Sequence, residues 1–329
     1  MSGTHAPLGE FDLIERYFRQ PQAGPASRPD VLLGIGDDAA VLRMPDADLV
    51  AAVDTVVAGR HFLPDCDPRS IGHRALAVNL SDFAAMGATP AWATLALTLP
   101  AVNEGWLERF SAGFMALANE HGVALVGGDT TAGPLTVSVQ ILGHVPHGTA
   151  LRRGGAQAGD LLVVTGTLGD AGAGLALASG RLTTSHRAAA QELLARFDYP
   201  TPRLQFGLRA RDIAHAAMDI SDGLTGDLPK LAAASGLAAH VDAARLPLSA
   251  ALQSVVSAAQ ARDWALAAGD DYELLLAVAP RQHDRLSDAA RQLNLTLTTI
   301  GDLRRGNAVT WEFDGASFDA PAQGYDHFR

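Results

Sequence analysis

Short stretches that combine glycine with aspartate recur along the whole chain, and their side chains are the ones best suited to chemistry. Aspartates that follow glycines make a poor helix and a poor strand, whereas glycine allows positive φ angles and close approach to the backbone. Each stretch is therefore expected to be a shaped loop that delivers carboxylates to one place. The aspartates of this kind lie in residues 34–38, 127–129, 219–223 and 269–271 and at Asp54 and Asp82.

Oxygen is the only kind of metal-ligand atom that these stretches offer, because no histidine stands at zinc-like spacing from another histidine or a cysteine. Carboxylate oxygens suit Mg²⁺, which proteins bind through carboxylates together with substrate phosphates. Several Mg²⁺ ions would turn a self-repelling set of carboxylates into a clamp for a nucleotide polyphosphate. Because phosphoryl transfer depends mainly on positioning and charge neutralisation, the pattern favours Mg²⁺-dependent use of ATP in a cleft between two domains.

The composition excludes several other classes of protein. A net charge of −11 argues against a nucleic-acid-binding surface. Lys230 is the only lysine, and with Pro229 before it and Leu231 after it, it fits neither a P-loop nor the strand lysine of protein kinases. The single cysteine, Cys66, excludes an intramolecular disulfide. Without an apolar run of ~20 residues or a secretory signal, we expect a cytoplasmic protein with no membrane contact.

Hydrophobic periodicity predicts the elements that must position these carboxylates. In the first part of the chain, helices are predicted at residues 8–19, 68–86 and 104–121, and strands at 39–42, 49–53, 91–99, 123–126 and 135–145. In the second part, strands are predicted at 160–165, 272–278, 296–300 and 308–313, and helices at 186–196, 203–216 and 280–293. A chain of 329 residues favours two domains, and the glycine-rich stretch 148–159 divides it into residues 1–149 and 150–329.

Three features have more than one interpretation. Asp82 shares a face of the helix 68–86 with Asn79 and is flanked by small or apolar residues, so it is either a ligand or an ordinary helix residue. The glycines of residues 166–174 suit close helix–strand packing better than a dinucleotide loop. Ser221 or Asp222 is expected to cap the following helix, whose N-terminus is either an ordinary Asx cap or an anion site.

Taken together and in order, these stretches resemble the thiamine-monophosphate kinase family. The resemblance extends from residues 9–11 to 324–328, and its motifs are Gly34-Ile35-Gly36-Asp37-Asp38, Asp54 through His61-Phe62, Val78-Asn79-Leu80-Ser81-Asp82, Val126-Gly127-Gly128-Asp129-Thr130-Thr131, Met218-Asp219-Ile220-Ser221-Asp222-Gly223-Leu224 and Gly269-Asp270-Asp271-Tyr272-Glu273-Leu274. This family belongs to the superfamily of aminoimidazole ribonucleotide synthetase and selenophosphate synthetase. The resemblance implies an α/β (α+β) fold of two domains. The N-terminal domain would have a mixed sheet with helices, bind ATP and Mg²⁺ and dimerise through strands, and a C-terminal α/β domain would complete the active site.

The resemblance also implies a reaction and a set of site residues. ATP would be the co-substrate, several Mg²⁺ ions the cofactor, and thiamine monophosphate the acceptor, giving thiamine diphosphate, in a homodimer. The implied Mg²⁺ ligands are Asp38, Val53 through its backbone, Asp54, Asp82, Asp129, Asp219 and Asp222. The implied nucleotide contacts are Gly128, Asp129, Arg153 and Ser221, and the positions near the thiamine phosphate are His61, Asp270 and Tyr325.

The chain departs from the family pattern in three places. Ala52-Val53 replaces a common Thr-Thr pair, so any metal contact there must come from backbone carbonyls. Ala268-Gly269-Asp270-Asp271 replaces Gly-Gly-Glu-Asp, which shortens a substrate-side carboxylate by one methylene. Ser111 stands where the family often has a tyrosine near the nucleotide.

A phosphate acceptor is already ionised at neutral pH, so neither a general base nor a covalent nucleophile is expected, and transfer is predicted to be direct and in line. Of the first aspartate pair, Asp38 is the expected ligand and Asp37 its support. A sister enzyme that acts on a purine intermediate or on selenide is the alternative, although Cys66 lies after His61 and is poorly placed for selenide chemistry. A metal- or nucleotide-binding regulator without turnover is the alternative from another class.

Overall fold

The protein is described by a computed structural model that covers residues 16–17, 30–33, 41–42 and 46–321. By its internal contacts the chain forms two compact units. The first unit holds the described residues up to Leu80 together with Thr89–Pro146, and the second holds Ser81–Ala88 together with the described residues from His147 onward. The sequence does not indicate that residues 81–88 belong with the second unit, and the domain division between residues 149 and 150 stays a prediction.

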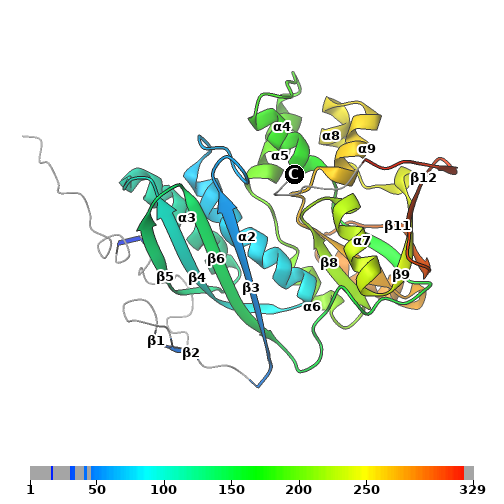
Figure 1. The fold of residues 1–329 in the computed structure, drawn as a ribbon, viewed down its shortest axis with the longest axis horizontal. Coiled ribbons are helices and arrows are strands. Elements are labelled where there is room, and N and C mark those ends of the chain that lie inside the picture. Colours follow the sequence, from blue (N-terminus) through cyan, green and yellow to red (C-terminus); the bar gives the residue numbers. More distant parts are fainter. Residues whose placement is uncertain (1–15, 18–29, 34–40, 43–45, 322–329) are drawn as a thin grey trace, which may run out of the picture. The chain divides into compact units, whose positions relative to one another are not determined.

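A four-stranded sheet in the order β3-β6-β4-β5 is the centre of the first unit (Figure 1). The strands β3, β6 and β4 pair antiparallel, whereas β5 runs parallel to β4. Their bounds are Asp48–Val57 for β3, Thr136–Val145 for β6, Thr89–Leu99 for β4 and Ala124–Ala132 for β5. A separate antiparallel pair is formed by β1 (Val31–Leu33) and β2 (Val41–Leu42).

Helices cover one face of this sheet. On β6 the alternate residues Val137, Val139 and Ile141 are fully buried, which is the period-2 pattern of a sheet with one covered face. Two helices lie on that side, α3 (Glu104–Glu120) and the part of α2 (Pro68–Met86) up to Leu80 (Figure 1). The buried stripe of α3 includes Phe110 and Phe114, at the spacing of an amphipathic helix.

Glycines allow α2 and α3 to approach at backbone distance. A Cβ atom at Gly72 of α2 would lie 2.1 Å from the carbonyl oxygen of Phe110, and one at Gly113 of α3 would lie 2.0 Å from that of Arg69. No side chain larger than hydrogen fits at either position without moving a helix.

A seven-stranded sheet in the order β13-β12-β9-β11-β7-β10-β8 forms the second unit. All of its strand pairs are antiparallel except β12 with β9, which is parallel. The strand bounds are Leu161–Thr165 for β7, Ala216–Ile220 for β8, Leu237–Asp242 for β9, Glu273–Val278 for β10, Leu297–Arg305 for β11, Val309–Phe313 for β12 and Ala316–Ser317 for β13. The helices are α4 (Asp170–Ala178), α5 (Arg187–Asp198), α6 (Leu204–Ala210), α7 (Leu224–Ala234), α8 (Ala250–Val255), α9 (Ala258–Ala267) and α10 (His283–Arg291), with 3₁₀ turns at Ala243–Arg245 and Pro280–Gln282.

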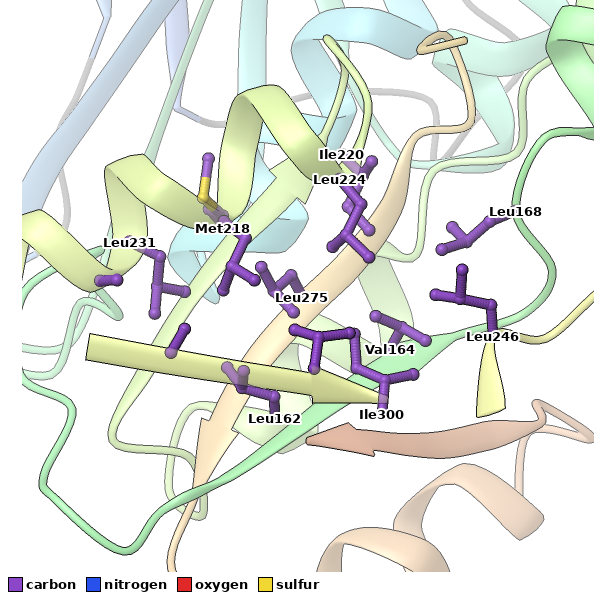
Figure 2. Packing of buried hydrophobic residues seen from close by; sticks show 14 of the residues in the cluster. Leu162, Val164, Leu168, Met218, Ile220, Leu224, Leu231, Leu246, Leu275 and Ile300 are labelled. Carbon is purple, nitrogen blue, oxygen red and sulfur yellow. The ribbon is translucent and has the colours of Figure 1, made fainter. Parts of the chain in front are cut away.

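The core of the second unit lies between this sheet and its helices. Leu162 and Val164 of β7, Met218 of β8 and Leu275 of β10 point into one layer (Figure 2). Leu231 of α7 packs into the same layer. All six residues of β10 are buried, and this strand lies between β7 and β8. Its sequence is accordingly an almost continuous apolar run that begins with one charged residue, Glu273.

Most predicted elements are present, and the differences have local causes. The predicted helix 203–216 ends at Ala210, because β8 begins at Ala216. The predicted strand 123–126 continues through the glycines to Ala132, since β5 keeps its pairing with β4. Sequence patterns did not predict β9, α8 or α9, and the predicted helix 8–19 lies almost wholly outside the described residues. None of the helices in the described ranges is long and apolar enough to cross a membrane.

Candidate functional site

Two of the predicted carboxylate stretches lie side by side in the second unit, although about fifty residues separate them. Asp219 is in the last part of β8, where it pairs with Leu274 of β10. Beyond this ladder, the N–H of Asp270 donates to the carbonyl of Ser221 at 2.8 Å, and the N–H of Tyr272 donates to that of Ile220 at 2.9 Å. The end of β8 and the loop before β10 therefore form one backbone-bonded surface.

The loop before β10 has an unusual backbone. Gly269, Asp270 and Tyr272 have φ angles of 72°, 61° and 49°. Aspartate tolerates this left-handed region, whereas a bulky residue such as tyrosine is seldom found there, and such strain costs on the order of 1–3 kcal/mol per residue. The hydroxyl of Tyr272 donates to Asp270 Oδ1 at 3.1 Å, which fixes the two side chains against each other.

Asp219 is a nearly buried carboxylate held by the second half of α2. Its side chain accepts a hydrogen bond of 2.8 Å from the Ser81 hydroxyl, and the whole residue is 6% exposed. Asp82, the next residue on α2, is half-buried and belongs to the same unit as Asp219. Ser81 was not predicted to act; its place beside Asp82 in the motif is the only sequence signal for it.

The predicted cap of α7 is wrong. The side chain of Asp227, and not that of Ser221 or Asp222, accepts hydrogen bonds from the backbone N–H groups that precede this helix. The N-cap of α7 is Gly223, which has no side chain to accept the bond. Instead Asp227 Oδ2 accepts from the backbone N–H of Ser221 at 3.0 Å and of Asp222 at 2.9 Å. The lone lysine, Lys230, then donates to Asp222 at 2.6 Å and to Asp227 at 2.9 Å.

The charges of this loop perturb one another. Burial raises the pKa of Asp227, although the hydrogen bond and charge of Lys230 act in the opposite direction. Burial alone would lower the pKa of Lys230, but its hydrogen bonds to Asp222 and Asp227 outweigh this and raise it. The predicted metal ligand Asp222 is thus already paired with a cation of the protein itself, Lys230 of α7. The sequence could have indicated the pairing of Asp227 with Lys230, because residues three apart on a helix lie on the same face.

In the first unit, the predicted site residues lie on opposite edges of the sheet. Asp54 of β3 pairs with Val139 of β6, and Gly128 and Asp129 of β5 pair with β4. Since β6 and β4 lie between them, the backbones of Asp54 and Asp129 are roughly 14 Å apart, at roughly 4.8 Å per strand. These two carboxylates are too far apart within one sheet to hold the same ion.

The sequence suggested that a strand ends before Gly128, but the structure shows otherwise. It lies inside β5 with a φ of 154°, and a Cβ there would be 1.9 Å from the carbonyl oxygen of Leu95 on β4. The close approach that requires this glycine is made by the neighbouring strand, and the ladder continues on to Ala132. Asp129 is consequently an exposed residue in the middle of a strand.

The other predicted residues have varied surroundings. His61 is half-buried in the turn after β3, where its Nδ1 accepts from the N–H of Val57 at 3.0 Å. Val53 is 64% exposed, and Arg153 is also exposed. The Ser111 hydroxyl donates a hydrogen bond to the carbonyl of Glu108 in the same helix. Asp38, its neighbour Asp37 and Tyr325 lie outside the described residues.

Within the described residues, no three histidine, cysteine, aspartate or glutamate side chains converge as a metal site would require. The predicted ligands that are described nevertheless fit Mg²⁺ in their chemistry, because each is a carboxylate or a backbone carbonyl. The described part of the chain therefore carries groups suited to Mg²⁺, but no three of the carboxylates converge there.

The glycines of residues 166–174 serve packing, as the sequence favoured, but Gly169 and Gly174 approach the helices α9 and α5 and not a strand. A Cβ at Gly169 would lie 2.7 Å from the backbone nitrogen of Ala265, and one at Gly174 would lie 2.2 Å from the carbonyl oxygen of Leu193. The N-terminus of α4 is occupied by a protein carboxylate: Asp271 Oδ2 accepts from the N–H of Gly169 at 2.8 Å. A phosphate at this helix end would have to displace Asp271.

Glu273 and its partners form a buried ion cluster that sequence reasoning missed. The fully buried Glu273 carboxylate accepts hydrogen bonds from Thr165 and from the guanidinium groups of Arg196 and Arg203. Asp271 is also buried, and burial raises its pKa to about 8 despite the Gly169 N–H and the charge of Arg196. The available signal was the alternation of Asp271 and Glu273 at the start of an otherwise apolar strand.

Comparison with known proteins places these features in a family. Residues 36–145 match the AIR synthase related protein N-terminal domain, and residues 157–312 match the AIR synthase related protein C-terminal domain. Thiamine-monophosphate kinase of Salmonella typhimurium is 48% identical over 322 residues, which is 97% of this chain and 98% of that protein.

Solved structures agree. The crystal structure of thiamine-monophosphate kinase from Stenotrophomonas maltophilia K279a is 50% identical, with a TM-score of 0.83 over 88% of this chain and 93% of that one. A structure of AaThiL complexed with AMPPCP and TMP is 30% identical, with a TM-score of 0.77 over 99% of this chain and 100% of that one. From the full-length similarity and the two matched domains, the chain belongs to the thiamine-monophosphate kinase family of enzymes, with its two-domain α/β fold.

Proposed function

We propose that this protein transfers the γ-phosphoryl group of ATP to thiamine monophosphate, in a Mg²⁺-dependent, direct in-line reaction that forms thiamine diphosphate. The observation that carries the proposal is the backbone-bonded pairing of the end of β8 with the loop before β10. It sets Asp219, Ser221 and Asp222 next to Asp270, in a chain that is similar along its whole length to thiamine-monophosphate kinases. A neighbour in the same family holds AMPPCP and TMP, which supports the same pair of ligands here.

The proposed roles follow the chemistry of each side chain. Mg²⁺ would be held by Asp38, the Val53 carbonyl, Asp54, Asp82, Asp129, Asp219 and Asp222. When bound, it would neutralise the charge of the phosphates. The separation of Asp54 from Asp129 within one sheet supports more than one ion. Gly128, Asp129, Arg153 and Ser221 are proposed to contact the nucleotide, and His61, Asp270 and Tyr325 to contact thiamine monophosphate.

Direct transfer requires no proton acceptor, because the attacking oxygen belongs to an ionised phosphate. The work of the protein is to bring that oxygen into line with the γ-phosphorus and to exclude competing water. Loops held by many backbone hydrogen bonds, such as residues 219–223 and 269–272, suit that task. Incubation with ATP alone, followed by isolation of the protein, should yield no phosphoenzyme; a trapped phosphoenzyme would show that the direct route is wrong.

A reconstitution assay tests the activity. Pure protein, Mg²⁺ and ATP are mixed in parallel with thiamine monophosphate, free thiamine or no acceptor, and thiamine diphosphate and ADP are measured. We expect both products only with the monophosphate. ADP formed with a purine intermediate or selenide in place of the monophosphate would favour a sister enzyme of the superfamily. Nucleotide binding without ADP under any condition would favour a regulator.

We further propose that the active protein is a cytoplasmic homodimer. The face of the four-stranded sheet opposite the helices has exposed apolar side chains on β3, with Leu49 56% and Val53 64% exposed. The neighbouring strand β6 presents Ser138 and Gln140 on the same face, where they pair with Thr55 and Val53. Exposed apolar side chains clustered on one strand suit burial against a second copy.

A further inference from the structure

A buried ion cluster lies directly behind the loop that holds Asp270, and the proposed reaction does not use it. Glu273, the first residue of β10, has no exposed surface. Its Oε2 accepts from Thr165 Oγ1 at 2.7 Å and from Arg203 Nε at 2.6 Å, while Oε1 accepts from Arg196 Nη2 at 2.7 Å. Arg203 Nη2 also donates to Oε1, so this arginine grips the carboxylate with two parallel bonds.

The fold leaves room for this carboxylate and for little else. A Cβ atom at Gly166, which follows β7 with a φ of 59°, would lie 2.2 Å from Glu273 Oε1. Arg196 is on α5, Arg203 immediately precedes α6, and each side chain is 19% exposed. The cluster therefore joins two helices and β7 to the residue at which the Asp270 loop enters the sheet.

Burying these charged groups costs free energy, so added stability is a poor explanation for the cluster. Two guanidinium groups share one carboxylate. Burial acts to lower the pKa of Arg196, but the charges of Glu273, Asp271 and Asp170 outweigh this effect and raise it. Taking several charges out of water costs several kcal/mol per ion, and buried ion clusters can often be replaced by apolar side chains without loss of stability. A requirement for precise placement explains the cluster better than stability does.

Buried contacts fix the loop that holds Asp270. Asp271 and Glu273 are buried, and Asp271 is bonded to the N-terminus of α4. Asp270 and Tyr272 take the left-handed φ angles and contact each other, and Tyr272 is buried as well. A residue in an unfavourable φ region keeps it only where its surroundings over-determine the backbone. Here the buried contacts of Asp271 and Glu273 do so, together with the backbone hydrogen bonds to Ile220 and Ser221.

We infer that Arg196, Arg203 and Glu273 are positioning residues for the thiamine monophosphate acceptor, because they hold the strained backbone that presents Asp270 to it. The inference rests on the proposed function and adds residues that do not contact substrate. Arg203 is the most specific member, since only a planar guanidinium makes the two parallel bonds. The substitution Arg203→Lys keeps the positive charge but cannot make the two parallel hydrogen bonds to Glu273.

The test uses the full-length protein and the variants Glu273→Gln, Arg203→Lys and Arg203→Met. Binding of thiamine monophosphate is measured by calorimetry without ATP, and KM and kcat for both substrates are measured with Mg²⁺-ATP. We expect the KM and Kd for thiamine monophosphate to rise by about tenfold to a hundredfold, since small misplacements have effects of this size, while the KM for ATP changes by less than about threefold. The rise should be larger for Arg203→Met than for Arg203→Lys.

Asp160→Asn is the matched control. Asp160 is 2% exposed, and its Oδ2 lies 2.9 Å from His215 Nδ1 in the same unit. This change therefore also alters a buried, hydrogen-bonded carboxylate, just before β7 and away from the loop. It should lower the melting temperature without changing the KM for thiamine monophosphate.

If Glu273→Gln does not fold, the positioning role is tested with the two Arg203 variants alone. Variants that are less stable but keep the wild-type KM and Kd for thiamine monophosphate would overturn the positioning role, as would an equal rise in the Asp160→Asn control. A wild-type protein that binds no thiamine monophosphate would instead overturn the proposed function, and with it the substrate that the cluster is inferred to position.

Discussion

Asp219 combines burial with a well-placed hydrogen-bond donor, the hydroxyl of Ser81. Among the described residues it is therefore the one best suited to test the proposed chemistry. Asparagine at this position keeps the shape of the side chain and an oxygen that can accept from Ser81. It removes the negative charge that the proposed Mg²⁺ site requires. The role of the residue in charge can therefore be separated from its role in packing.

We expect Asp219→Asn to lower kcat by at least about a hundredfold, as is typical when one group that stabilises developing charge is lost. Its free energy of unfolding should stay within about 1 kcal/mol of wild type, because shape and hydrogen bond are kept. Thiamine diphosphate formation and urea unfolding measure the two quantities. Asp302→Asn, which changes a carboxylate bonded to the exposed Arg304, is the control and should keep full activity. Near-normal turnover in Asp219→Asn would remove this residue from the site.

Asp271 allows a test by pH. Its pKa is raised from the ordinary 3.8 to about 8, first by burial and also by the charge of Asp170, against the bonds from Gly169 and Ala171 and the charge of Arg196. Between pH 3.8 and about pH 8, Asp271 is therefore protonated in the folded protein but ionised in the unfolded chain. The free energy of unfolding therefore contains a contribution from Asp271 that is largest below about pH 4 and is lost as the pH rises towards 8.

Asparagine mimics the protonated carboxyl and cannot titrate, so Asp271→Asn should remove that dependence. Urea unfolding at several pH values from 5 to 8 should show wild type losing stability relative to the variant as the pH rises. The difference between the two proteins cancels the titration of groups that both contain. Parallel stability curves would mean that Asp271 is ionised in the folded state throughout this range.

At the scale of secondary structure, the contact of α2 with α3 depends on Gly72 and Gly113. Helices usually keep their axes 8–10 Å apart because side chains lie between them. Here each glycine faces a backbone carbonyl of the other helix, at a distance that would leave a Cβ about 2 Å from oxygen. Such a contact cannot be relieved by turning a side chain, and the helices must move instead.

Gly113→Ala should lower the free energy of unfolding by about 1–3 kcal/mol, the usual cost of overpacking a close contact. Gly105→Ala on the same helix is the control. It is exposed, its nearest neighbour would lie 3.7 Å from the new Cβ, and alanine is the better helix former, so stability should be unchanged or higher by up to about 1 kcal/mol. Urea unfolding of both variants tests the contact, and equal effects would argue against it.

For the whole molecule, the open question is assembly. Leu49, Val53 and Val102 are the exposed large apolar side chains among the described residues, and two of the three are on one face of β3. Since β3 is the edge of its sheet, a second copy could cover this face along the whole strand.

Leu49→Glu should therefore shift the protein from two copies to one in sedimentation velocity at micromolar concentration, because a charge cannot be buried in an apolar contact without a partner. Val102→Glu is the matched control: it lies in the connection between β4 and α3, is 46% exposed, and should leave the mass unchanged. A wild-type monomer, or a dimer in both variants, would place the interface elsewhere or exclude it.

The sequence by itself determined the elements and stretches whose information is local. The stripe of Leu107, Phe110 and Phe114 is enough to specify α3, and the apolar run after Glu273 specifies β10. The order of the aspartate motifs was enough to indicate the family, because each motif is a contiguous set of residues.

Only the tertiary structure decided which stretches meet, because strand pairing and burial join residues that are distant in sequence. The pairing of β8 with β10 brings residues 219–222 against 269–272, whereas the strand order of the other sheet keeps Asp54 and Asp129 apart. It likewise decided that the free N–H groups before α7 go to Asp227 and that Glu273 lies between two arginines. A charged residue in the sequence looks the same whether water or a guanidinium surrounds it, and packing alone makes that choice.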